Sequence, residues 1–133
     1  HAPHLKQNKE KTYPNSPSGM PGVQTLVPVM LNHVNEGKLT LEQFINSVCE
    51  NPVKIFGIKN KGFIKEGFDA DFTIVDMEKK ILIQNEKIES KCGWSPFDGL
   101  EFKGTPVATI INGKTKMKDG KIIGQPEGKP LIF

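Results

Sequence analysis

Several features that mark nucleic-acid-binding and membrane proteins are missing from this 133-residue sequence. Its 18 Lys and Arg exceed its 15 Asp and Glu by only three, and the basic residues are scattered lysines without an arginine-rich cluster or interleaved aromatics. A nucleic-acid surface normally needs such a basic patch. No apolar run approaches the roughly 20 residues of a membrane-spanning helix. With 36% hydrophobic and 25% charged residues, the composition is typical of a soluble globular protein.

Cysteine is also scarce. Cys49 and Cys92 are the only two, and they show neither a CxxC arrangement nor paired metal-ligand spacing. A disulfide framework or a structural zinc site usually requires more cysteines at closer spacing. We therefore expect two reduced thiols, buried or half-buried, in a cytoplasmic protein.

Proline and glycine are concentrated in residues 1–22, around a lysine-rich middle. This composition predicts a long loop, and loops of this length in compact domains are usually either functional or disordered. The exposed lysine-rich middle fits a flexible flap between two ordered ends. Residues 23–36 then carry apolar side chains at helical spacing, with Thr25 as N-cap, Pro28 at the third helical position and Gly37 just after the end. Thr40 opens a second helix, and Gln43 completes a capping box.

A third, short helix is predicted from Asn51 and Pro52, as N-cap and first helical residue, to Gly57. Strand-like segments follow, joined by the turn dipeptides Asn112-Gly113 and Asp119-Gly120. The expected strands are residues 72–75, 81–83, 107–112, 114–118 and 121–123. The order of parts is therefore loop, helices and meandering sheet.

Few residues are candidates for catalysis, metal binding or ligand binding. His1 and His4 lie in HAPH, but no carboxylate or third histidine follows at metal-ligand spacing, so the motif alone does not predict a metal site. His33 falls on the polar side of its helix, where we expect an exposed side chain. Other candidates have structural explanations: turn capping for Asp69, Asp71 and Asp76, and anchoring of a loop for Trp94 and Phe97.

Two sets of motifs carry a family resemblance. NPVKIFG and KGFIKEGFDADFTIVD resemble the join between the last barrel helix and the C-terminal sheet of the amidohydrolase superfamily. HAPH, PSGMPGVQT, WSPFDG and KGTPVATIINGK, from His1 to about Gly120, resemble the long bacterial dihydroorotases. The resemblance implies an α/β fold. Residues 1–57 would be the last active-site loop and helices of a (β/α)8 TIM barrel, and residues 58–133 part of a small β-sandwich domain with its tail.

The resemblance also implies site residues. His4 would contact the substrate carboxylate, and the backbone of Ser18 and Gly19 would lie on the pyrimidine ring, with Gly22 helping to shape the loop. No catalytic or metal-binding residue is expected in this chain. The family's zinc ligands, including the aspartate that acts as general acid and base, would lie outside it, and that aspartate would directly precede His1.

The implied activity is reversible hydrolysis of dihydroorotate to N-carbamoyl-aspartate in pyrimidine biosynthesis. This chain, as one segment of a zinc-dependent enzyme that needs its upstream part, is expected to be inactive alone. Two alternatives stay open: another cyclic amidohydrolase such as an allantoinase or dihydropyrimidinase, and a non-catalytic scaffold that supports aspartate transcarbamoylase. A homodimer is a further expectation.

Overall fold

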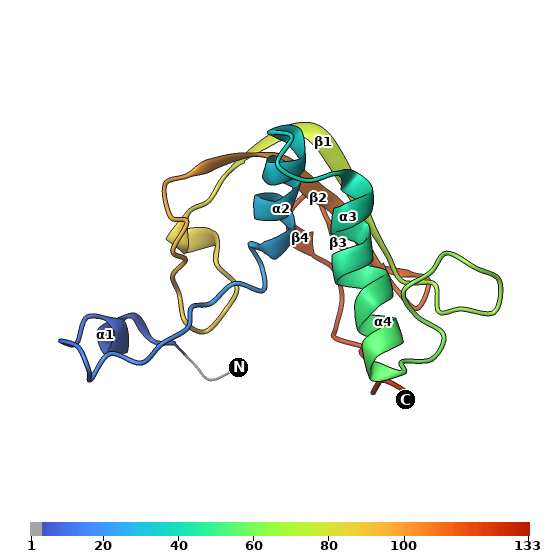
Figure 1. Ribbon diagram of the computed structural model, residues 1–133, viewed down its shortest axis with the longest axis horizontal. Coiled ribbons are helices and arrows are strands. Elements are labelled where there is room, and N and C mark those ends of the chain that lie inside the picture. The colour runs from blue at the N-terminus through green and yellow to red at the C-terminus, as the bar shows by residue number, and fades with distance from the viewer. Residues whose placement is uncertain (1–3) are drawn as a thin grey trace.

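A computed structural model describes residues 4–133. In Figure 1 the chain forms an arch, with α1 at the end of one leg, α4 at the foot of the other, and α2 and the sheet across the top. The elements follow the order α1, α2, α3, a π-helical segment η1, α4, β1, a short 3-10 turn η2, and β2 to β4. The order of helices before a meandering sheet is as predicted.

Helix α1 (Lys6–Lys9) is a single turn inside the region predicted as loop, so that prediction was wrong for these four residues. Helix α2 (Leu26–Asn35) begins after Thr25, which puts Pro28 at the third helical position, as predicted. The Thr25 side chain does not cap the helix, however, and its Oγ1 donates to the Gly22 carbonyl at 3.3 Å. The helix ends as expected, because the amides of Gly37 and Lys38 bond back to its last turn.

The second and third helices are one continuous element, and the prediction that Asn51 starts a new helix was wrong. Helix α3 (Leu41–Ile45) has the predicted capping box between Thr40 and Gln43. It runs directly into η1 (Asn46–Glu50) and α4 (Asn51–Phe56), and Asn51 itself has helical backbone angles. A proline has no amide donor and crowds the preceding turn, so the wider π turn before Pro52 accommodates it without breaking the helix. Gly57 ends the helix in the predicted place.

The four strands form one antiparallel sheet in the order β1-β2-β3-β4. Strand β1 (Phe72–Leu82) joins two segments that we predicted as separate strands, and its register shifts between Asp76 and Lys80. There the Asp76 carboxylate accepts from the amides of Glu78 and Lys79 at 2.9 and 3.0 Å. Long cross-strand pairing and this local cap keep the irregular segment within one strand.

Strand β2 (Glu101–Ile111) begins earlier than predicted, while β3 (Lys114–Lys118) matches the prediction and β4 (Lys121–Ile122) is one residue shorter. Both predicted hairpin turns are confirmed. The residues of Asn112-Gly113 and Asp119-Gly120 all have positive φ, as a two-residue hairpin turn requires.

The core lies between α2 and the sheet. Its most buried apolar side chains are Leu31, Phe44, Ile83 and Phe102. Leu31 is completely buried, and it packs so closely on β2 that a Cβ on Gly104 would lie 2.7 Å from the Leu31 Cβ. Gly104 also has a φ of +100°, so any other residue there would be strained and would push the helix away.

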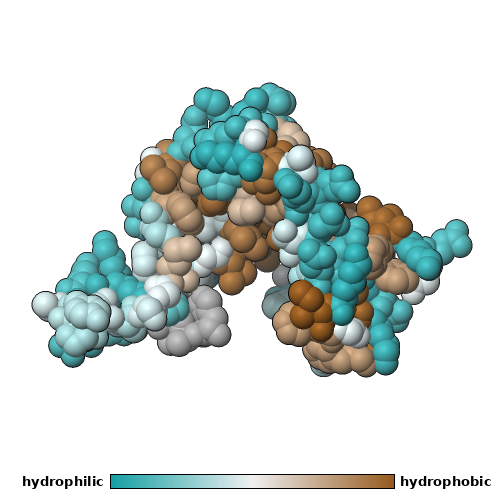
Figure 2. Space-filling model, in the orientation of Figure 1, coloured by the Kyte–Doolittle hydropathy of each residue, from teal (hydrophilic) through white to brown (hydrophobic). Residues whose placement is uncertain are grey.

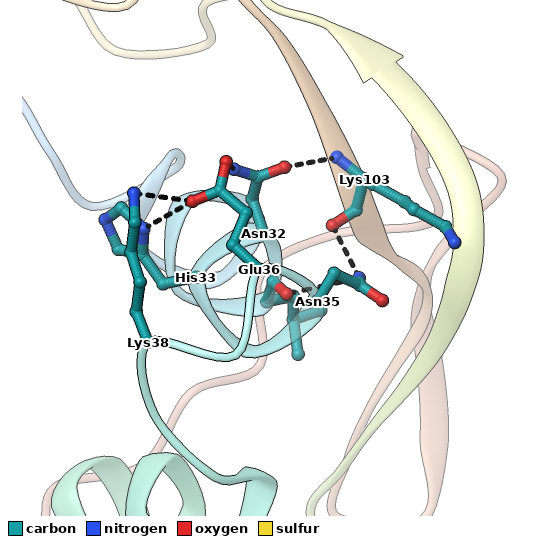
Figure 3. Close-up of polar contacts among 7 residues, drawn as sticks. Asn32, His33, Asn35, Glu36, Lys38 and Lys103 are labelled. Atoms are coloured by element: carbon teal, nitrogen blue, oxygen red, sulfur yellow. Dashed lines mark hydrogen bonds and ion pairs between the residues drawn. The ribbon is translucent and has the colours of Figure 1, made fainter.

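Polar side chains attach α2 to the sheet (Figure 3). The side-chain oxygen Oδ1 of Asn32 accepts from the main-chain amide of Lys103 at 3.0 Å. The side-chain nitrogen Nδ2 of Asn35 lies within 3.2 Å of the main-chain carbonyl oxygens of Leu31, Met77 and Lys103. Two asparagines one turn apart thus link the helix to both β1 and β2.

The molecule exposes more surface than its mass predicts. Its accessible surface is 9462 Å², whereas a compact monomer of this size exposes about 7,000 Å². Many large apolar side chains are exposed, among them Ile55 at 73% and Ile64 at 89%. Figure 2 shows hydrophobic residues on the inner side of the arch and at the foot of the leg that contains α4. Among residues 4–133, no helix is both long and apolar enough to span a lipid bilayer.

Candidate functional site

The main chain of His4 is held by two side chains from a distant segment of the chain. The Trp94 indole N–H donates to the His4 carbonyl at 2.5 Å, and the His4 amide donates to the Cys92 Sγ at 3.3 Å. His4 itself is half-buried. The main chain at the start of the loop is therefore positioned by residues about 90 positions later in the sequence.

The imidazole of His4 lies against the backbone of Gly19. A Cβ on Gly19 would be 2.8 Å from His4 Cε1 and 3.0 Å from Nε2, and Gly19 has a φ of +87°. Both the left-handed backbone and the close approach require glycine at this position. Of the three predicted site residues, the structure thus brings His4 and Gly19 into direct contact.

Ser18, the third predicted residue, lies beside them in a loop that Lys9 closes. Lys9 Nζ donates to the Pro17 carbonyl at 2.5 Å and to the Ser18 carbonyl at 3.0 Å, and Ser16 Oγ donates to the Lys9 carbonyl at 3.1 Å. Ser18 and Gly19 are both exposed. The loop from His4 to Gly19 therefore presents an imidazole, exposed main chain and a lysine charge.

The other end of the loop is tied to the same distant segment. Gln24 Nε2 donates to the Lys87 carbonyl at 2.8 Å, and Gln24 Oε1 accepts from the Glu89 amide at 2.9 Å. A small cavity of about 60 Å³ lies at this junction, lined by Pro21, Gly22, Val23, Gln24, Thr25, Ile88, Ser90 and Trp94. Gly22, which we expected to shape the loop, is among these lining residues.

The two cysteine thiols differ in the direction in which their pKa values are shifted. The Ser90 hydroxyl, and next the His4 amide, hold the pKa of the Cys92 thiol below its usual value. Partial burial and then the Glu50 carboxylate raise the pKa of Cys49 instead. Both thiols are free, as predicted, and Cys92 is half-buried, but Cys49 is exposed and that part of the prediction was wrong.

The described residues do not form a metal site. Within residues 4–133, no three or more His, Cys, Asp or Glu side chains gather closely enough to hold an ion. His1 lies outside the described residues. This donor set does not fit a zinc ion, so no chemical step can be assigned to a metal on these residues.

The other candidates have structural roles, as the sequence indicated. Lys61 Nζ pairs with the carboxylates of Asp69 and Asp71 at 3.0 and 2.5 Å, and Lys61 lowers the pKa of Asp71. Asp71 also accepts from the Asn112 amide at 2.7 Å. His33 lies on the outer side of α2 with a side chain 38% exposed, 3.4 Å from Glu36 (Figure 3).

Sequence reasoning missed the residues that hold the loop, namely Lys9, Gln24 and Cys92, and it assigned Trp94 only a general anchoring role. Their hydrogen-bond partners are main-chain carbonyls and amides between 8 and 90 residues away, and no local pattern signals such pairs. Phe97 did behave as expected, because its ring contacts that of Phe102 in the core at a centroid distance of 5.7 Å.

Comparison with known proteins points the same way as the motifs. Dihydroorotase of Pyrococcus furiosus is 44% identical over 132 residues, which cover 99% of this chain and 31% of that protein. Dihydroorotase of Methanothermobacter thermautotrophicus is 36% identical over 123 residues, covering 92% of this chain and 28% of that protein. The chain spans about a third of the length of these relatives.

Solved structures agree on the fold. An L-hydantoinase (dihydropyrimidinase) from Arthrobacter aurescens superposes with a TM-score of 0.79 and 34% identity, over 84% of this chain and 25% of that one. A D-hydantoinase superposes with a TM-score of 0.81 and 30% identity, over 94% of this chain and 28% of that one. Residues 17–116 match the Amidohydrolase family. The chain, an α/β segment with a four-stranded antiparallel sheet, therefore belongs to the amidohydrolase family.

Proposed function

We propose that this chain is the C-terminal segment of a zinc-dependent dihydroorotase, which reversibly hydrolyses the cyclic amide of dihydroorotate in pyrimidine biosynthesis. The similarity to dihydroorotases at 36 to 44% identity supports this proposal. Residues 1–57 would supply the last active-site loop and helices of a TIM barrel, and residues 58–133 part of a β-sandwich. The total accessible surface of 9462 Å² is about 2,500 Å² larger than that of a compact monomer, and many of the exposed side chains are large and apolar. These features support packing of this segment on further polypeptide. The complete enzyme would be cytoplasmic.

The contact between His4 and Gly19 is the single observation that carries the substrate assignment. An imidazole beside exposed main chain can bind two different parts of one small molecule. The ring N–H of His4 suits a carboxylate, and the N–H and C=O groups around Ser18 and Gly19 suit the amide edges of a pyrimidine ring. Dihydroorotate carries both groups.

The residues of this chain would bind and orient the substrate without making or breaking its bonds. His4 would hold the carboxylate, while the glycine would let the ring approach the main chain closely. Zinc and the aspartate acid and base would belong to residues outside this chain, since residues 4–133 hold no cluster that fits the ion.

Replacement of His4 tests this assignment. In the complete enzyme, H4A should raise KM for dihydroorotate by about 10- to 100-fold, because a hydrogen bond to a charged group contributes about 1.5–3 kcal/mol. The matched control is H33A, which removes an exposed imidazole on α2 and should leave KM unchanged. An H4A enzyme with the parent KM would overturn the substrate role of His4.

Hydantoinase or dihydropyrimidinase activity is the second candidate, favoured by the structural similarity to enzymes of that name. Hydantoin lacks the free carboxylate that His4 would bind. Turnover of dihydroorotate and of hydantoin by the complete enzyme separates the two, and faster hydantoin hydrolysis would reverse our assignment. If the residues outside this chain lack the family's zinc ligands, a non-catalytic scaffold for aspartate transcarbamoylase, either a monomer or a homodimer, would be favoured instead.

A further inference from the structure

Trp94 and Gln24 connect the candidate substrate loop to one segment of the sheet region at both of its ends. Trp94 donates to the carbonyl of His4 at the loop's beginning. Gln24 bonds the main chain of Lys87 and Glu89 at the loop's end, through both its amide nitrogen and its amide oxygen. Between these two ends, the Lys9 side chain donates to the Ser18 carbonyl and so links two parts of the loop.

The segment that receives these bonds is itself held firmly. Asp98 accepts from the Asn85 amide at 2.9 Å and from the Asn85 side chain at 2.8 Å, and Asn85 Oδ1 accepts from the Ser95 amide at 2.8 Å. Ser95 is only 5% exposed. Phe97 packs on the core residue Phe102. Residues 85–98 therefore form a braced support that is fixed to the sheet.

We propose that Trp94 and Gln24 are positioning residues that set the place of the His4 imidazole over Gly19. The inference rests on the proposed function, since it assumes that His4 binds substrate. Trp94 acts on the main chain of His4 and not on the substrate. Because the His4 carbonyl and imidazole belong to one residue, releasing the carbonyl lets the ring leave its site against Gly19. Gln24 holds the opposite end, so that the two ends of the loop keep a constant separation.

Conservative variants of the complete enzyme separate this role from general packing. W94F keeps an aromatic ring in the wall of the small cavity, removes the indole N–H that bonds His4, and makes the ring system smaller. Q24L keeps the side-chain size and removes both polar atoms. Each variant should raise KM for dihydroorotate about three- to tenfold, the effect of one or two neutral hydrogen bonds, with kcat within about twofold of the parent.

The double variant W94F/H4A distinguishes a positioning role of Trp94 from a purely structural one, because only a positioning role makes the effect of W94F on KM depend on His4. If Trp94 acts through His4, W94F should change KM by less than about twofold in an H4A background, because coupled residues are non-additive. F44L is the control for lost stability, since Phe44 is a buried residue of α3. It should lower the melting temperature and leave KM unchanged.

The outcomes are distinguishable. If H4A raises KM but W94F and Q24L do not, or if their effects multiply fully with that of H4A, the positioning role is wrong and the substrate role of His4 stands. If H4A itself leaves KM unchanged, both proposals fall. Should W94F not fold, Q24L on the exposed side of the junction decides the question by the same criteria.

Discussion

At the scale of single residues, the candidate site depends most directly on Gly19, whose lack of a side chain makes room for the His4 imidazole. In the complete enzyme, G19A should raise KM for dihydroorotate by about tenfold or more, because the new Cβ would lie 2.8 Å from the His4 imidazole and a displaced ring loses its hydrogen bond to the substrate. Steady-state kinetics on the purified variant measures the change.

The matched control for that prediction is G67A. Gly67 has almost the same left-handed backbone, with a φ of +85°, but a Cβ there would meet nothing within 4 Å. G67A should therefore cost about 1 kcal/mol of stability without affecting KM. If both variants shift KM equally, backbone strain and not contact with His4 explains the effect.

At the scale of elements, the attachment of α2 to the sheet depends on Asn35. Its side-chain nitrogen reaches three carbonyls, from α2, β1 and β2. N35A should lower the free energy of unfolding by about 1–2 kcal/mol, because these carbonyls lose their donor. The denaturant midpoint, with amide exchange at Lys103 as a local probe, measures this loss.

H33A is again the appropriate comparison, on the outer face of the same helix. His33 makes one exposed pair with Glu36 at 3.4 Å, and exposed pairs contribute little. Its replacement should change stability by less than about 0.5 kcal/mol. Equal losses in H33A and N35A would mean that helix propensity, and not the link to the sheet, accounts for the change.

Elements differ in how well local sequence predicts them. The capping box at Thr40 and the turn at Asn112-Gly113 were predicted correctly because all the interacting groups lie within four residues. The separate helix at Asn51 was predicted wrongly, since the same Asn-Pro pair fits either a helix start or a π turn. The length of β1 also escaped prediction, because the residues on both sides of its irregular middle pair with β2, while the middle itself is capped by Asp76.

At the scale of the whole molecule, we expect the 133-residue chain alone to be inactive. Its described part holds no group of side chains that could bind zinc. The purified chain with added zinc should hydrolyse dihydroorotate no faster than a zinc-only blank, while the complete enzyme serves as the positive control. Turnover above the blank would contradict both the division of roles and the absence of catalytic residues here.

The candidate site shows the same division between local and long-range information. HAPH and PSGMPG pointed to His4, Ser18 and Gly19, and two of these residues do meet in space. That contact is a property of the folded chain, as are the bonds from Trp94 and Gln24. One hydrogen bond joins residues 4 and 94, which lie 90 positions apart and belong to no common sequence motif.

Local chemistry alone was enough to specify the capping box at Thr40, the hairpin turns, the order of helices and sheet, and the family, because each depends on neighbouring residues or on a contiguous motif. Packing decided the remainder: the merging of predicted helices and strands, the close approach of α2 to Gly104, and the place of the His4 ring. These features depend on groups that meet only after the chain has folded, and an imidazole's position is set by whichever distant partners hold its backbone.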